Sequence, residues 1–267
     1  MNDPLSGVAE AFSRKAQVYD AFGAGHTNLE RMRQKVRSHI LAWLQPGDRI
    51  LELNAGTGGD AVFFAEHGFP VHATDLSPGM VTQIEAKIAA QPLPGRLTVQ
   101  QCSFLDLKKV TGGPYQCVFS NMGGVNCTAQ LETVARGLDP LLAPGGFVTW
   151  VVMPPVCLWE LAQVLRGDFR VASRRISPRG TLANVEGVRF TTYYYTPARI
   201  QRAFGPRYSR LGLQGLSVFT PPADHKDFPR RRPRLYRLLN ALEERYADLP
   251  PFNRCGDFYI LSLRRIQ

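Results

Sequence analysis

A glycine-rich turn within residues 50–60 is the part of the sequence best suited to hold a ligand. An apolar run ends at Glu52 and Leu53, and the chain then passes through NAGTG at 54–58 before a helix is expected at about Asp60. Glycines allow a sharp turn at positive φ and let a ligand approach bare backbone. The first N–H groups of the following helix lack partners and can bind a carboxylate. Flavin and nicotinamide proteins use similar turns, so this turn alone does not identify the ligand.

Asp75 supplies a second polar group of the right kind. It follows an apolar run at 71–74, and a carboxylate at a strand end can accept hydrogen bonds from the two vicinal hydroxyls of a ribose. The same stretch also fits a helix start, with Ser77 as N-cap and Pro78 at the first helical position, and both interpretations can hold together. The spacing of the glycines differs from the G-x-G-x-x-G of dinucleotide-binding proteins, which argues against a nicotinamide dehydrogenase.

The elements that must position these residues alternate regularly along the chain. The expected strands are 49–53, 71–74, 97–101, 117–120 and 147–153, and the expected helices between them are 60–67, 79–90 and 130–142. Strands that are apolar on both faces and alternate with helices indicate a parallel sheet covered on each side. We therefore predict an α/β fold with a doubly wound, mostly parallel, Rossmann-like sheet, whose ligand lies at the carboxyl ends of the strands.

We expect one domain over 1–267, because this length is near the upper limit of a single core. Its predicted parts are N-terminal helices at 1–45, a ligand-binding core at 46–153, a lid-like insertion at 154–196, and a C-terminal part at 197–267 that completes the sheet. Within the insertion, a short helix should be followed by an arginine-rich surface loop to about Gly180 and by a hairpin that turns near Glu186.

These residues resemble the class I S-adenosylmethionine (SAM)-dependent methyltransferases, in particular the small-molecule branch that includes quinone-biosynthesis methyltransferases. The resemblance covers 49–153 well and the N-terminal helices loosely. The family's glycine motif typically reads [DE]-x-G-x-G-x-G, and this chain has Asn54 at the first glycine. Asn is the non-glycine residue that best tolerates positive φ, so we expect the turn to be kept. The resemblance implies a seven-stranded sheet, SAM as cofactor and methyl transfer to a small-molecule acceptor.

The resemblance also implies where SAM would lie. Asp75 would hold the ribose, and Ser103 stands where the family usually has the acid that meets the adenine amino group. Phe104 is either an adenine contact or part of the core. Asn121 would lie beside the sulfonium, and Tyr19 would cover the methionine end. The implied SAM-binding residues are Tyr19, Glu52, Asn54, Ala55, Gly56, Thr57, Gly58, Asp75, Leu76, Met80, Ser103, Phe104 and Asn121, with Leu76 and Met80 against the adenine.

No residue is singled out as a general base. Methyl transfer mainly needs in-line approach and a dry pocket, and a base is needed only if the acceptor must lose a proton. The candidates are His26 in the loop before the second helix, Asn126 near the expected substrate pocket and Tyr193 in the hairpin. Each has a structural alternative: a helix start, a turn or cap, and sheet packing. The five cysteines are scattered without a C-x-x-C pair, so we expect no disulfide and no metal site.

The net charge of +10 leaves several partners open. Arginines cluster at 230–237, which fits nucleic acid, an anionic membrane or simply a solvated helix start. In the following helix, leucines at 235, 238, 239 and 242 either pack on the sheet, which we favour, or lie in a membrane interface with a lipid or quinone acceptor.

Nucleic-acid methylation is disfavoured because the [DN]-P-P-[YF] motif is absent after the fourth strand, where the chain reads NMGG. A non-catalytic SAM-binding protein of the same fold stays as an alternative. No apolar run reaches the ~20 residues that span a bilayer, and the N-terminus does not read as a signal peptide, so we expect a cytoplasmic protein.

Overall fold

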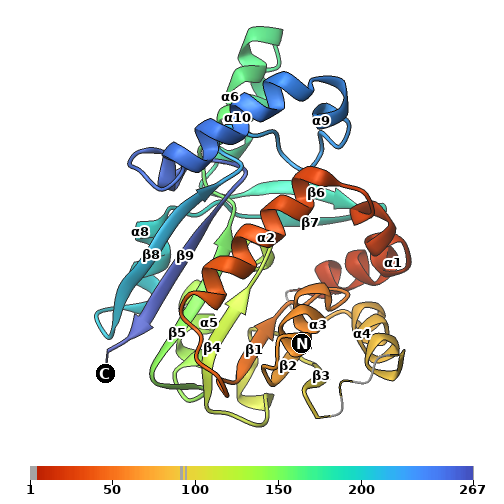
Figure 1. Ribbon diagram of the computed structural model, residues 1–267, viewed down its shortest axis with the longest axis vertical. Coiled ribbons are helices and arrows are strands. Elements are labelled where there is room, and N and C mark those ends of the chain that lie inside the picture. Colours follow the sequence, from red (N-terminus) through yellow and green to blue (C-terminus); the bar gives the residue numbers. More distant parts are fainter. Residues whose placement is uncertain (1–4, 91–92, 94, 267) are drawn as a thin grey trace.

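A seven-stranded sheet runs through the centre of the protein (Figure 1). The computed structural model describes residues 5–90, 93 and 95–266. The strands lie in the order β3-β2-β1-β4-β5-β9-β8, and β9 runs antiparallel to both of its neighbours. Their bounds are β1 Ile50–Leu53, β2 Val71–Asp75, β3 Leu97–Gln101, β4 Tyr115–Ser120, β5 Leu142–Val152, β8 Tyr208–Leu216 and β9 Phe258–Arg265. The predicted doubly wound, mostly parallel sheet is confirmed.

Helices cover both faces of this sheet. Their bounds are α1 Ser6–Gly23, α2 Thr27–Leu41, α3 Gly59–Glu66, α4 Pro78–Ala90, α5 Leu131–Leu138, α8 Pro197–Phe204 and α10 Pro233–Tyr246. Successive residues of β1 point to opposite faces: Ile50 packs with the core of α2, α3 and α4, whereas Leu51 packs with that of α5 and α8. Among the described helices, none is long and apolar enough to cross a bilayer.

The end of α5 differs from the prediction. The helix was expected to continue to Leu142, but it ends at Leu138, and Leu142 is already the first residue of β5. The Pro-Gly-Gly sequence at 144–146 lies inside this strand, at a point where its register against β4 shifts. A bulge of this kind lets a strand carry residues that would otherwise break it.

The segment between β5 and α8 contains more regular secondary structure than the predicted arginine-rich loop. It contains α6 Leu158–Leu161, η3 Ala162–Arg166, α7 Phe169–Ser173 and η4 Arg174–Ile176, followed by the hairpin β6 Thr181–Val185 and β7 Val188–Thr192. The expectation of a surface loop to Gly180 is wrong, because Arg175 is only 4% exposed and pairs with buried carboxylates. The predicted hairpin is confirmed, and both turn residues, Glu186 and Gly187, have positive φ.

Helix α10 follows α9 Phe228–Arg231 and lies at the top of the molecule near α6 (Figure 1). The favoured expectation, that its leucines pack on the sheet, is wrong for Leu235 and Leu238, which are 45% and 57% exposed. Its buried residues are instead Tyr236 and Glu243. The Glu243 carboxylate accepts hydrogen bonds from the backbone N–H groups of residues 218, 219 and 220, which follow β8.

This carboxylate gives a stability prediction. We expect Glu243→Ala to lower the free energy of unfolding by about 2–4 kcal/mol, because it leaves buried N–H groups without an acceptor. Urea denaturation followed by circular dichroism measures the change. The matched control is Glu244→Ala, which removes an exposed carboxylate paired with Arg31 and Lys35 and should cost at most about 1 kcal/mol. Equal losses in the two variants would contradict the anchoring role of Glu243.

Candidate functional site

The glycine-rich turn closes the carboxyl end of β1 as its sequence predicted. Asn54, Gly56 and Gly58 all have positive φ, of 46°, 57° and 79°. The prediction that Asn54 keeps the turn is therefore confirmed. Gly58 is also required by packing, since a Cβ there would lie 2.9 Å from the side chain of Ile84. Helix α3 starts directly after it, so its first N–H groups face the turn.

Asp75 at the end of β2 is fixed against this turn. One carboxylate oxygen accepts the N–H of Gly56 at 2.9 Å, and the other accepts the N–H of Ser77 at 2.8 Å. Burial raises the pKa of Asp75 to about 6, although these backbone N–H groups act in the opposite direction. The Ser77 hydroxyl also accepts the N–H of Met80, so the predicted helix cap exists beside the carboxylate.

Two adjoining cavities lie over these strand ends and share Tyr19, Asn54, Gly56, Asn121 and Met122. The cavity toward β2 adds Phe12, Asp75, Met80, Gly123, Gly124 and Cys127. The cavity toward α3 adds Arg33, Glu52, Ala55, Thr57, Gly59 and Asp60. Most of the predicted ligand-binding residues are thus brought together at one edge of the sheet.

The cavity toward α3 contains an unsatisfied acid and an unpaired cation. Glu52 is 2% exposed, its Oε2 atom has no hydrogen-bond partner, and burial raises its pKa well above the usual range. Arg33 of α2 lines the same cavity, and no carboxylate of the described residues pairs with its guanidinium. Together they offer an acceptor for an ammonium group and a donor for a carboxylate, as an α-amino acid requires. Sequence reasoning missed Arg33, because one arginine on an amphipathic helix carries no distinctive signal.

Helix α1 lines the cavities, and specific side-chain contacts hold it against the glycine-rich turn and α4. The Asp20 carboxylate accepts hydrogen bonds from the Thr57 hydroxyl and from Lys87, which also binds the Thr57 carbonyl. Ser13 contacts Ser77 through their hydroxyls, and a Cβ on Gly79 would lie 2.9 Å from the Ser13 backbone. The tyrosine–aspartate pair at 19–20 therefore places one residue in the cavity and uses the other to attach α1 to the glycine-rich turn.

Asn54 connects the turn after β1 to the loop after β4. Its side-chain oxygen accepts the Ser120 hydroxyl at 2.7 Å, and its amide nitrogen lies 3.4 Å from the carbonyl of Asn121. The side chain lies directly over Gly124, where any Cβ would come within 1.9 Å of the amide nitrogen of Asn54. The departure from the usual glycine motif is thus accommodated by a glycine on the opposite loop.

A third cavity adjoins the first two at Tyr19, Arg33 and Met122. Its apolar lining comprises Phe22, Leu29, Met122, Met153, Ala223 and Phe258, and its charged lining comprises Lys15, Arg33, Arg174, Arg175, Asp224 and Asp257. Cations outnumber acids in this lining. One wall comes from the segment after β5, another from the loop before α9, and a third from α1 and α2.

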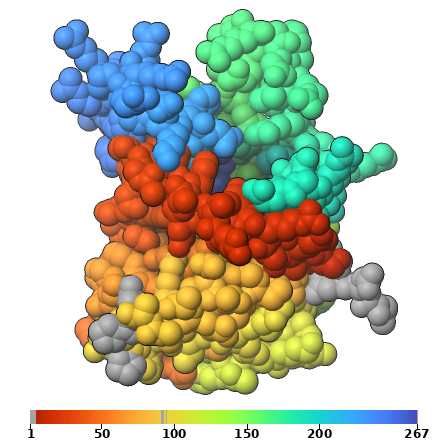
Figure 2. Space-filling model, turned by 90° about the vertical axis from the view of Figure 1, so that its right-hand side faces the viewer, coloured from red at the N-terminus to blue at the C-terminus, as the bar shows by residue number. Residues whose placement is uncertain are grey.

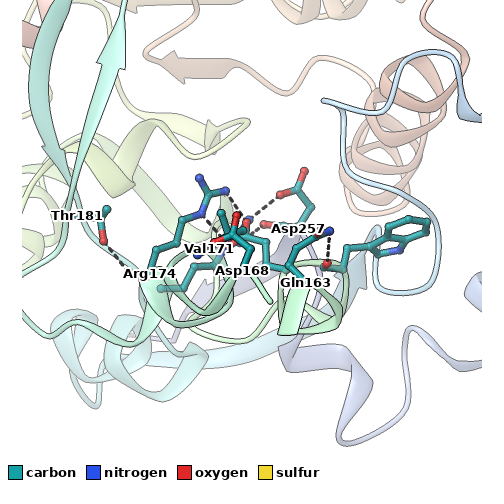
Figure 3. Close-up of polar contacts among 9 residues, drawn as sticks. Gln163, Asp168, Val171, Arg174, Thr181 and Asp257 are labelled. Atoms are coloured by element: carbon teal, nitrogen blue, oxygen red, sulfur yellow. Dashed lines mark hydrogen bonds and ion pairs between the residues drawn. The ribbon is translucent and has the colours of Figure 1, made fainter. Parts of the chain in front are cut away.

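A buried ion cluster holds the first of these walls in place (Figure 3). Glu160 accepts hydrogen bonds from the guanidinium groups of Arg174 and Arg175, and Arg175 also binds the carboxylate and carbonyl of Asp257 at the start of β9. Burial alone would lower the pKa of Arg175, but Asp257 and Glu160 raise it above its usual value. Because both acids are taken up by arginines, this cluster does not resemble a metal site, although Cys157 lies beside it.

The three catalytic candidates do not meet at a cavity. Both ring nitrogens of His26 are engaged, one with the N–H of Leu29 and the other with the carbonyl of Ala223. Asn126 is fully buried, and its side chain binds backbone atoms of Met153 and Tyr193. Tyr193 lines a different surface pocket, near residues 127–130. Of the implied adenine contacts, Met80 lines the cavity, whereas Leu76, Ser103 and Phe104 do not, and Phe104 is part of the core.

Comparisons with known proteins agree with this geometry. The family model "Methyltransferase domain" matches residues 50–146. A malonyl-[acyl-carrier protein] O-methyltransferase of Pseudescherichia vulneris is 25% identical over 236 residues, 88% of each chain. A protein-L-isoaspartate O-methyltransferase of Methylorubrum populi is 29% identical over 62% of this chain and 73% of its own length. The Burkholderia thailandensis 1,6-didemethyltoxoflavin-N1-methyltransferase, solved with S-adenosylhomocysteine, has a TM-score of 0.59 at 16% identity and covers 100% of this chain and 92% of its own.

The strand order and the cavity at the strand ends define a protein of the class I methyltransferase fold. With the methyltransferase domain at 50–146, the chain is a SAM-dependent methyltransferase, and SAM is its cofactor.

The contact between Asn54 and Gly124 can be tested by a double-mutant cycle. Gly124→Ala should weaken SAM binding at least about tenfold, because the new methyl group displaces the Asn54 side chain into the cavity. Asn54→Gly alone should change the affinity less than about threefold, since glycine tolerates the positive φ. Calorimetry with SAM measures both variants.

In the double variant Asn54→Gly/Gly124→Ala the clash is absent, so the affinity should return to that of Asn54→Gly. A double variant as impaired as Gly124→Ala would show that the two residues act independently.

Proposed function

We propose that this enzyme transfers the methyl group of SAM to a carboxylate of a small-molecule acceptor and forms a methyl ester. The observation that carries the proposal is the third cavity, in whose lining cations outnumber acids and no histidine is present. Its non-cationic titratable groups are Tyr19, Asp224 and Asp257. Asp257 is paired with Arg175, burial raises the pKa of Tyr19, and Asp224 is exposed to solvent.

The first two cavities would hold SAM, which supplies an electrophilic methyl group. Asp75 would accept both ribose hydroxyls, and Met80 would lie against the adenine, since both residues line the first cavity. Glu52 and Arg33 would bind the ammonium and carboxylate of the methionine part, where their unused polar atoms fit an amino acid. Tyr19 and Met122, which line all three cavities, would surround the site of transfer and exclude water.

The acceptor chemistry follows from the charges in the third cavity. A carboxylate is already deprotonated at neutral pH, so it attacks the methyl group without a base and releases no proton. The Lys15 ammonium lies over the rings of Tyr19 and Phe22, and no carboxylate of the described residues pairs with it, so it can pair with an anion. The apolar lining suits the rest of an amphiphilic molecule. The names of two relatives, the malonyl and isoaspartate O-methyltransferases, describe methylation of carboxyl groups and support the same chemistry.

The segment 154–196 would act as a lid, because it forms one wall of the acceptor cavity and is anchored by Glu160 and Asp257. A second candidate function, methylation of a lipid or quinone at an anionic membrane, is favoured by the exposure of Leu235 and Leu238 beside the basic cluster. A cytoplasmic location is compatible with either function.

The raised pKa of Asp75 predicts how SAM binding depends on pH. The ionised carboxylate is the better acceptor for ribose hydroxyls, so affinity should fall as the pH drops through about 6 and Asp75 gains a proton. Calorimetry should give about tenfold weaker binding at pH 5 than at pH 7. The Asp75→Asn variant should bind SAM weakly at both pH values, and its affinity should not change between pH 5 and pH 7. The same pH dependence in that variant would assign the titration to another group.

The methyl ester gives a chemical test of the acceptor class. Protein incubated with methyl-labelled SAM and a small-molecule extract, or with a panel of soluble carboxylic acids, should form a labelled product that releases volatile methanol in alkali. Label that withstands alkali would indicate an ether or amine product and contradict the carboxylate assignment.

Lys15→Met is the matched variant, since it keeps the length of the side chain and removes its charge. It should raise KM for the acceptor about tenfold and leave the affinity for SAM unchanged. A loss confined to SAM binding would place Lys15 with the cofactor instead.

A further inference from the structure

Two lobes rise side by side at one end of the molecule (Figure 2). One is formed by residues 158–176, which contain α6, η3, α7 and η4, and the other by α9 and α10. In Figure 2 they are the green and blue groups at the top, with a hollow between them. The acceptor cavity has Arg174 and Arg175 from the first lobe on one side and Ala223 and Asp224, which lead into the second, on the other. The first lobe thus lines this cavity and the second adjoins it, while α1 and α2 supply a further wall.

Both lobes expose large apolar side chains to solvent. In the first lobe, Leu165 is 89% exposed and Phe169 is 66% exposed, on either side of a turn at Gly167. In the second lobe, Leu235 and Leu238 of α10 are 45% and 57% exposed. Exposing large apolar side chains to water is unfavourable, and groups of them on a protein surface commonly mark an interaction site.

The same lobes carry cations without partners. Arg166 and Arg170 flank the turn of the first lobe, and Arg232, Arg234 and Arg237 lie on the second. No carboxylate in the described part of the chain pairs with any of these five arginines, whereas Arg230 and Arg231 pair with the exposed Asp227. Each apolar group thus has arginines beside it, and the exposed Asp168 only partly offsets the charge of Arg166 and Arg170 in the first lobe.

We propose that the two lobes form a docking surface for an anionic phospholipid bilayer, with the mouth of the acceptor cavity facing the membrane. The apolar side chains enter the boundary between headgroups and acyl chains, and the arginines bind phosphate groups beside them. An amphiphilic carboxylate dissolved in the bilayer then reaches the cavity without crossing water. This last step rests on the proposed carboxylate acceptor, whereas the docking itself does not.

The shape of the surface favours a bilayer over an acidic protein. Leu165 and Phe169 project from one lobe, and Leu235 and Leu238 from the other, with the hollow between them. A protein partner needs a complementary, closely packed surface across such a patch. A fluid bilayer conforms to separate projecting groups, and its negative charge matches the unpaired arginines on both sides.

Vesicle sedimentation tests the docking without any turnover. The full-length protein should sediment with vesicles of phosphatidylcholine and phosphatidylglycerol but not with phosphatidylcholine alone, and high salt should weaken the binding. Leu165→Ser/Phe169→Ser and Arg234→Gln/Arg237→Gln should each reduce the binding by about tenfold or more. The matched controls are Ile266→Ser, an exposed apolar residue at the opposite end, and Arg136→Gln on α5, and neither should change it.

Calorimetry with SAM and methyl transfer to a soluble carboxylic acid keep the two proposals separate. The variants at 165/169 and 234/237 should retain SAM binding and methyl transfer, because none of these four residues lines a cavity described for SAM or the acceptor. Absence of sedimentation with the mixed vesicles would overturn the docking proposal and leave the methyltransferase assignment intact. Sedimentation that the lobe variants do not reduce would also overturn it, and so would binding to an acidic protein but not to vesicles.

Discussion

The buried carboxylate of Asp75 is the interaction on which the site depends. It joins the ends of two parallel strands, because its oxygens accept N–H groups from the turn after β1 and from the start of the helix after β2. A carboxylate at 8% exposure is costly without such donors. The donors hold it in one orientation, with its remaining acceptor sites facing the cavity. The turn, the first helix and the acceptor wall are all arranged around that cavity.

A second constraint is the close approach of the loops after β1 and β4. Asn54 fills the space over Gly124 and binds Ser120, so the two loops together line the first two cavities. Tyr19 and Met122 stand where these cavities meet. The reaction proposed for this point requires alignment of the acceptor, exclusion of water and a positive environment.

The sequence was most informative where local pattern determines structure. The alternation of apolar runs and helices predicted the sheet, and the residues at 54–58 and 75 predicted its ligand edge, because turns at positive φ and strand ends have strong local signatures. The burial and contacts of isolated arginines could not be predicted from the sequence. Arg175 is buried only because Glu160 and Asp257, distant in sequence, converge on it, and Arg33 reaches the cavity only through the packing of α2. The exposure of Leu235 and Leu238 likewise depends on the rotation of α10, which is set by the contact of its Glu243 with the loop after β8.

The central claim is that one continuous cradle, from Asp75 to Arg33, fits SAM. A crystal structure of the protein with S-adenosylhomocysteine tests it most directly. We expect the ribose hydroxyls on the Asp75 carboxylate, the amino-acid end between Glu52 and Arg33, and the sulfur facing the cavity that contains Lys15. Density for the ligand elsewhere, or a cradle that stays empty at saturating concentration, would contradict it.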